Sequence, residues 1–139
     1  MQTEDIIEVA PGIHYQWLEN YQIITFKMAN NDKKAIDAYI NANMDILNSW
    51  PKDRPYLTLQ EGVEGFLMTP YLRQRSTEVI QIMNEHGLEG RIAAVTPSTL
   101  VAYVLQFLMR GTFHVHLNKV TTHLFTNRED AIAWLKEAL

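Results

Sequence analysis

Hydrophobic and polar residues follow two periods along this chain, which predicts strands and helices in turn. Residues 13–18 and 21–28 are rich in aromatic and β-branched side chains, and only Glu19 and Asn20 separate them. Two such runs joined by a two-residue connection predict a β-hairpin. Shorter runs of the same kind predict three further strands, at residues 56–59, 91–95 and 120–125.

Helical spacing of apolar residues, with boundary signals, predicts four helices. The first covers residues 33–49 and ends before Pro51. The second opens at Thr69-Pro70 and runs to His86, and the third opens at Thr96-Pro97 and runs to about Arg110. In both, a threonine N-cap is followed by a proline in the first turn. The last helix covers residues 127–138, with Thr126 and Glu129 as a capping box.

The predicted order is β-β-α-β-α-β-α-β-α, which indicates an α/β fold. Strands that alternate with helices after an opening hairpin form a mixed, mostly parallel sheet, here of five strands covered by four helices. Residues 13–139 form one predicted domain. Residues 1–12 precede it as an N-terminal arm, or supply an extra edge strand. Residues 111–118 either extend the third helix or form a strand.

Composition narrows the function classes. The chain has 139 residues, no cysteine, and 16 acidic against 12 basic residues, for a net charge of −4. The absence of cysteine excludes disulfides and thiolate chemistry, and the absence of a basic run argues against a nucleic-acid partner. The longest nearly apolar run, residues 100–109, is too short to span a bilayer. We therefore expect a soluble, cytoplasmic protein.

The order of elements, together with the ending Leu124-Phe-Thr-Asn-Arg-Glu-Asp-Ala-Ile-Ala-Trp-Leu135, resembles the STAS-like families related to anti-sigma-factor antagonists. It is most similar to their divergent branch, whose fold approaches that of the CRAL-TRIO lipid carriers. The resemblance implies a regulatory module that works through protein contacts, or, on the CRAL-TRIO side, a carrier of a small apolar ligand.

The junction before the second helix departs from that family. Antagonists regulated by phosphorylation carry an Asp-Ser-x-Gly turn there, whereas residues 60–70 of this chain contain no Asp-Ser and form a longer loop. Thr69 occupies a comparable position at the helix start, where the helix dipole favours an anion, so the resemblance makes it a candidate phosphoacceptor. The alternative is a plain N-cap threonine, like Thr96.

Candidate catalytic groups are few, and none forms a recognisable motif. His114 and His116 would share one face of a strand, as metal ligands must, and a third ligand would come from His123 or from elsewhere in the fold; the alternative is a set of exposed or interface histidines. Glu61 and Glu64 flank the carboxyl end of the third strand. We predict no enzymatic activity, no metal and no cofactor, with a small metal-assisted hydrolase as the distant alternative.

Residues 100–109 are apolar around nearly the whole predicted helix, with Gln106 as the exception. A second apolar face must be covered by another part of the chain, a second subunit or a ligand. The predicted function is a non-enzymatic regulatory module acting through a protein partner or self-association as a homodimer, and the alternative is binding of a small apolar molecule. The candidate ligand or interface residues are Phe66, Met68, Tyr71, Tyr103, Phe107 and Leu108.

Overall fold

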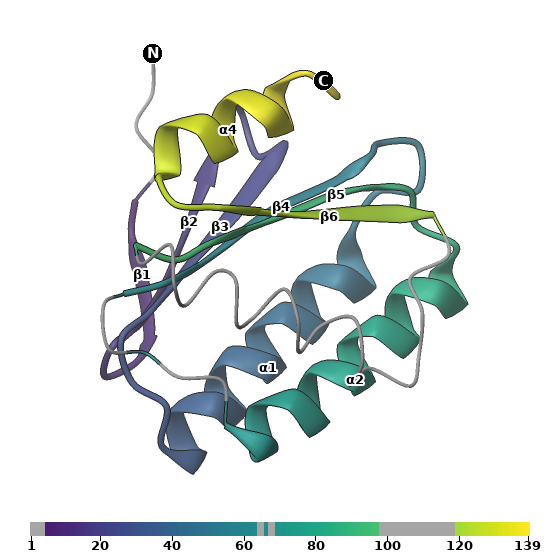
Figure 1. Ribbon diagram of the computed structural model, residues 1–139. Helices are drawn as coiled ribbons and strands as arrows, with labels where there is room; N and C mark the ends of the chain where they lie inside the picture. The colour runs from purple at the N-terminus through teal and green to yellow at the C-terminus, as the bar shows by residue number, and fades with distance from the viewer. Residues whose placement is uncertain (1–4, 64–65, 67–68, 98–118) are drawn as a thin grey trace.

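The computed structural model describes residues 5–63, 66, 69–97 and 119–139 (Figure 1). The described strands are β1 (Ile7–Ala10), β2 (Ile13–Leu18), β3 (Ile23–Met28), β4 (Tyr56–Gly62), β5 (Gly90–Val95) and β6 (Val120–Phe125). The described helices are α1 (Lys33–Ser49), α2 (Pro70–His86) and α4 (Arg128–Lys136). None of these helices is both long and apolar enough to cross a membrane.

The strands form one mixed sheet of six, in the order of the sequence. β1, β2 and β3 pair antiparallel, and β3, β4, β5 and β6 pair parallel. The predicted α/β class and mixed sheet are confirmed, but the predicted number of five strands is wrong. The sixth strand is β1, whose Ile7 lies opposite Tyr15 of β2. The described part of the chain holds three of the four predicted helices. The predicted third helix and residues 111–118 lie almost wholly outside it.

The connection between β2 and β3 is longer than predicted. Glu19, Asn20 and Tyr21 all have positive φ, between 53° and 64°. The Gln22 amide donates to the Leu18 carbonyl at 3.2 Å. β3 therefore begins at Ile23 instead of residue 21. Three successive left-handed residues turn the chain where a two-residue hairpin was expected.

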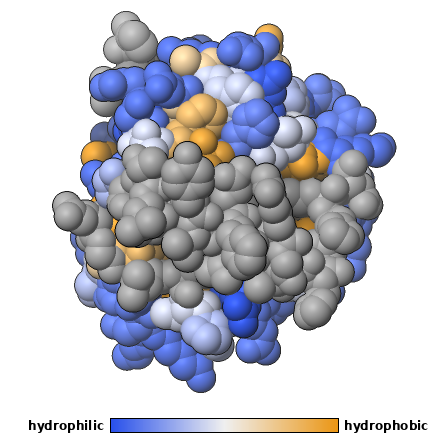
Figure 2. All heavy atoms as spheres, in the orientation of Figure 1, coloured by the Kyte–Doolittle hydropathy of each residue, from blue (hydrophilic) through white to orange (hydrophobic). Residues whose placement is uncertain are grey.

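The sheet lies between α1 and α2 on one side and α4 on the other (Figure 1), and it separates two hydrophobic cores. α1 and α2 cover one face, where the larger core includes Phe26, Ile40 and Met83. α4 lies on the opposite face against a smaller core that includes Leu59 and Leu135. Because side chains alternate along a strand, the inner strands β2, β3, β4 and β5 contribute to both cores. On the face shown in Figure 2, the described surface is largely hydrophilic and its hydrophobic residues show only in small patches.

The bounds of α1 and α2 agree with the predicted ones. Asp32 caps α1 by accepting a hydrogen bond from the Ala35 amide at 2.8 Å. Gly87 ends α2 in the left-handed conformation, with φ of 64°. At α4 the predicted capping residue, Thr126, is wrong. The cap is its neighbour Asn127, whose side chain accepts from the Asp130 amide at 2.8 Å.

Candidate functional site

A small pocket lies at the carboxyl ends of the parallel strands β4 and β5, on the side of the sheet covered by α1 and α2. Its volume is about 120 Å³. The parallel register aligns Gln60 of β4 with Ala94 of β5, and Ala94 with Leu124 of β6, so these three side chains form its floor. Ligands of open α/β sheets bind at this edge of the sheet. The described residues that line the pocket are Met28, Tyr39, Gln60, Gly62, Phe66, Leu72, Ser76, Ala94, Val95, Thr96 and Leu124.

Phe66 is the predicted ligand-binding residue that the structure places in this pocket. Its amide donates to the Val63 carbonyl at 3.0 Å, which closes a turn directly after β4. The turn brings the ring over Gly62, where an added methyl group would lie 3.0 Å from the Phe66 ring. Glycine at position 62 therefore gives Phe66 the room to form a wall of the pocket.

A buried hydrogen-bond network forms one side of the pocket. The Tyr39 hydroxyl donates to the Gln60 side-chain oxygen at 2.5 Å. The Gln60 amide nitrogen donates to Asn43 at 3.2 Å and to Thr58 at 2.7 Å, and Asn43 donates in turn to the Tyr39 carbonyl at 2.9 Å. Tyr39, Asn43 and Thr58 are buried. Each polar group of the Gln60 side chain therefore has a partner, as buried groups require.

The buried phenols of this region are neutral. Burial raises the pKa of Tyr39 well above its ordinary value of 10.0, and the nearby Tyr56 raises it further. Burial likewise raises the pKa of Tyr56. A phenol held in this state donates and accepts hydrogen bonds but does not act as a base or nucleophile near neutral pH.

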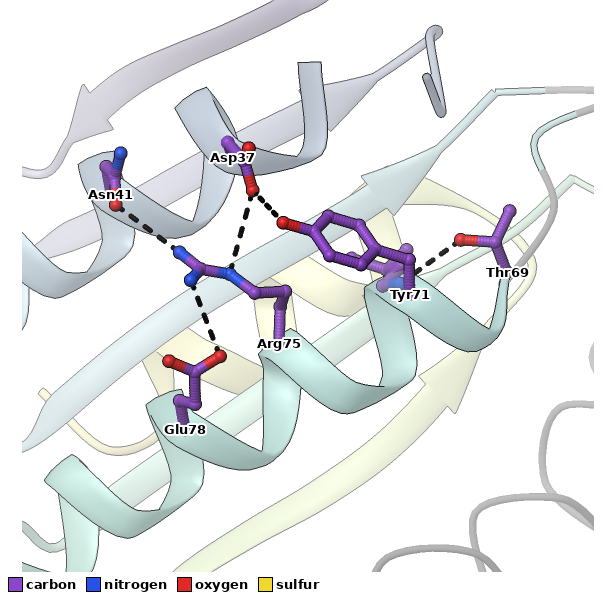
Figure 3. A network of polar contacts seen from close by, with 7 residues as sticks. Asp37, Asn41, Thr69, Tyr71, Arg75 and Glu78 are labelled. Carbon is purple, nitrogen blue, oxygen red and sulfur yellow. Dashed lines mark hydrogen bonds and ion pairs between the residues drawn. The ribbon is translucent and has the colours of Figure 1, made fainter. Parts of the chain in front are cut away.

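Tyr71, a second predicted site residue, is not among the described residues that line this pocket. It belongs to a network of polar contacts between α1 and α2 (Figure 3). Its hydroxyl donates to Asp37 of α1, and this bond raises the pKa of Tyr71. Arg75 of α2 lies 3.8 Å from the same Asp37 carboxylate and 3.5 Å from Glu78, and it donates to Asn41 at 3.4 Å. The cluster thus links α1 to α2.

Thr69 caps α2, as its plain structural alternative predicts. Its hydroxyl oxygen accepts from the Leu72 amide at 3.1 Å (Figure 3). Its role as phosphoacceptor stays a prediction. Of the other candidate ligand or interface residues, Met68, Tyr103, Phe107 and Leu108 lie outside the described residues.

The candidate catalytic groups that the structure describes have structural partners. Glu61 forms an ion pair with Arg128 at 2.9 Å. His123 stacks on Trp134 of α4, with 4.6 Å between ring centroids and 9° between planes. Within the described ranges, no group of three side chains is arranged to hold a metal ion. His114, His116 and Glu64 lie outside those ranges.

Most of the pocket is not predicted from the sequence. One signal was available: Asn43 is polar and falls on the apolar stripe of α1, between Ile40 and Leu47. A polar residue at a buried helical position requires a buried partner. Gln60, the first residue after the predicted strand at residues 56–59, is such a partner in the structure.

Comparison of the chain with family models, with curated proteins and with solved structures found no match.

Proposed function

We propose that this chain is a non-enzymatic binding module of STAS-like architecture, and that its pocket at the ends of β4 and β5 holds a small neutral molecule. The observation that carries the proposal is the pocket itself. It combines apolar walls with one polar side, at the edge of the sheet where α/β proteins bind ligands.

The chemistry of the lining supports a mainly apolar ligand with one hydrogen-bonding group. Met28, Phe66, Leu72 and Leu124 supply apolar walls. A charged ligand would lose its hydration there without an opposite charge to replace it, because the described lining contains no Lys, Arg, His, Asp or Glu. The Tyr39 hydroxyl oxygen can still accept a hydrogen bond from a ligand hydroxyl. An apolar protein cavity of about 150 Å³ takes up benzene, so a pocket of about 120 Å³ suits a molecule of similar size.

The same lining supports binding without catalysis. Ser76 and Thr96 supply hydroxyls, but a serine or threonine nucleophile needs an adjacent base. Tyr39 has a raised pKa, so it is unsuited to that role. A STAS-like regulatory module that senses a ligand needs no such base.

Titration with phenol, followed by amide resonances, tests the pocket. Phenol is neutral at pH 7 and carries one hydroxyl. We expect saturable shifts at Gln60, Ala94 and Leu124, and weaker binding of toluene, which lacks the hydroxyl. Native mass spectrometry of freshly purified protein then looks for a retained small molecule.

Ala94→Leu fills the pocket from its floor and should abolish these shifts, while Ala133→Leu on the exposed surface of α4 is the matched control. If Ala94→Leu fails to fold, Ser76→Leu fills the pocket from α2. Absence of saturable shifts, or unchanged phenol affinity in a folded filled variant, would overturn the proposal.

A second candidate is a module that acts through protein contacts, including self-association as a homodimer. The observation in its favour is the outer edge of β1, which pairs with no described strand; Ile7 of β1 is 42% exposed and the preceding Ile6 is 66% exposed. An unpaired strand edge with apolar side chains is a template for another chain. Light scattering after size exclusion tests this reading. A dimer that Ile7→Lys dissociates supports self-association through β1, and a monomer at micromolar concentration contradicts it.

A further inference from the structure

A second and larger hollow lies on the opposite face of the sheet. α4 packs on β4, β5 and β6, and the hollow lies beside it over the antiparallel strands. Its volume is about 460 Å³, within the usual range of about 300–1,000 Å³ for ligand sites. The described residues that line it are Ile6, His14, Tyr15, Gln16, Thr25, Lys27, Ala29, Val63 and Arg128.

The three basic side chains in the described lining of this hollow come from three different elements. His14 belongs to β2, Lys27 to β3 and Arg128 to the first turn of α4. The described lining contains no carboxylate. This concentration of basic groups stands out because the chain as a whole carries a net charge of −4.

The sheet register brings two of these groups face to face. His14 lies directly opposite Lys27 in the antiparallel pair of β2 and β3. Side chains at such positions are neighbours on one face, with Cβ atoms about 4.5–5.5 Å apart. Neither residue forms a hydrogen bond or ion pair with another described residue, so both can donate to a ligand.

Arg128 is held in place over the hollow. One guanidinium nitrogen contacts Glu61 at 2.9 Å, and the other donates to Thr25 at 3.5 Å. Two carboxylates that are not part of the described lining lie near these basic groups. Glu61 lies between Lys27 and Arg128 and is paired with Arg128, and Glu8 of β1 lies opposite His14 and is exposed. Lys27 forms no ion pair with a described residue, although Glu61 lies opposite it in the register of β3 and β4.

We propose that this hollow is a binding site for a small organic monocarboxylate. Lys27 supplies the charge that the carboxylate neutralises, His14 and Arg128 supply further donors, and Ile6, Ala29 and Val63 give the hydrocarbon part an apolar wall. Within the described lining, Arg128 is ion-paired with Glu61 and Lys27 is not ion-paired with a described residue, so Lys27 is the cation available to one carboxylate. The site is separate from the pocket at the ends of β4 and β5, and it does not depend on the function proposed for that pocket.

Benzoate is the probe, with benzyl alcohol as the neutral molecule of the same shape. In an amide-resonance titration at pH 7 and low salt, we expect benzoate to give saturable shifts at Gln16, Thr25 and Lys27, and benzyl alcohol to bind at least tenfold more weakly. Shifts confined to Gln60 and Ala94 would place benzoate in the other pocket and overturn this proposal.

Lys27→Gln should weaken benzoate binding about tenfold and should leave the fold intact, because Lys27 is exposed. Lys52→Gln makes the same charge change at an exposed position that is not part of the lining and is the matched control. Equal benzoate affinity in the two variants, or equal affinity for benzoate and benzyl alcohol, would refute a carboxylate site. An Arg128→Gln variant checks the second donor by the same titration.

Discussion

Tyr39→Phe is the substitution that most directly tests the buried network beside the pocket. It removes one hydroxyl and leaves the ring in place. The ring packs edge-on against Phe26, with 5.4 Å between centroids, so the apolar contacts of Tyr39 are retained. The change therefore isolates one hydrogen bond, from the Tyr39 hydroxyl to Gln60.

The expected cost comes from what the hydroxyl leaves behind. Gln60 donates through its nitrogen to Asn43 and Thr58, and the donor to its oxygen is Tyr39. Without that donor, a partly buried amide oxygen loses its partner at a cost of about 1–3 kcal/mol. We expect a loss of about 2 kcal/mol, which in a domain of this size lowers Tm by roughly 6–10 °C.

Urea unfolding, followed by circular dichroism, measures this cost. We expect the urea concentration at the unfolding midpoint to fall. The dependence of the unfolding free energy on urea concentration should stay unchanged, because the surface exposed on unfolding stays the same. Tyr71→Phe is the matched control. It removes the same atom from a tyrosine of α2 that bonds to Asp37 near the protein surface, and we expect no measurable change.

Two results would refute this reasoning. If the free energy of unfolding of Tyr39→Phe lies within about 0.5 kcal/mol of that of the unaltered protein, the Gln60 oxygen does not depend on Tyr39 for its partner. If the two substitutions have equal effects, burial does not decide the cost of losing the hydroxyl.

Two further predictions concern stability. Burial raises the pKa of Tyr39 and Tyr56 in the folded state above 10.0, so both groups leave stability unchanged below pH 10 and reduce it as the pH rises above 10. Urea unfolding from pH 8 to 11 should show this loss. If Tyr39→Phe does not change how steeply the free energy of unfolding falls with pH, the prediction is contradicted. Gly90→Ala should prevent stable folding, because the added carbon would lie 1.9 Å from the Tyr56 carbonyl oxygen. At Gly87 an added carbon meets no atom within 4 Å, so Gly87→Ala should cost only about 1–2 kcal/mol for its left-handed backbone. Thermal melts in which Gly87→Ala is the less stable variant would contradict this prediction.

The parts of the fold that depend on local signals are predictable from the sequence. The predicted bounds of α1 and α2 match the structure, because a capping residue marks each start and Pro51 or Gly87 marks each end. The start of α4 is off by one capping residue, since Thr126 and Asn127 are adjacent and both can cap. β1 is ambiguous because a short edge strand takes its stability from a neighbour elsewhere in the chain.

The candidate sites are much less predictable, because they depend on register. Gln60, Ala94 and Leu124 meet only through the parallel pairing of β4, β5 and β6. His14 meets Lys27 only if β3 starts at Ile23, and a one-residue slip would place one of them on the other face. The three left-handed residues that set this register have no strong signature in the sequence.

The two-sided sheet also has a consequence for the newly made chain. Every strand pairs with its neighbour in sequence, so the sheet can grow in the order of synthesis, and α1 and α2 are available to cover their face as it grows. Of the described helices, α4 is the one that covers the other face, and it is made last, after β6. Among the described residues, Leu57, Leu59 and Val95 therefore lack the apolar cover of Ala131 and Leu135 until α4 docks. For this protein, the interval before α4 docks is therefore the period of greatest exposure to aggregation and of greatest value for a chaperone.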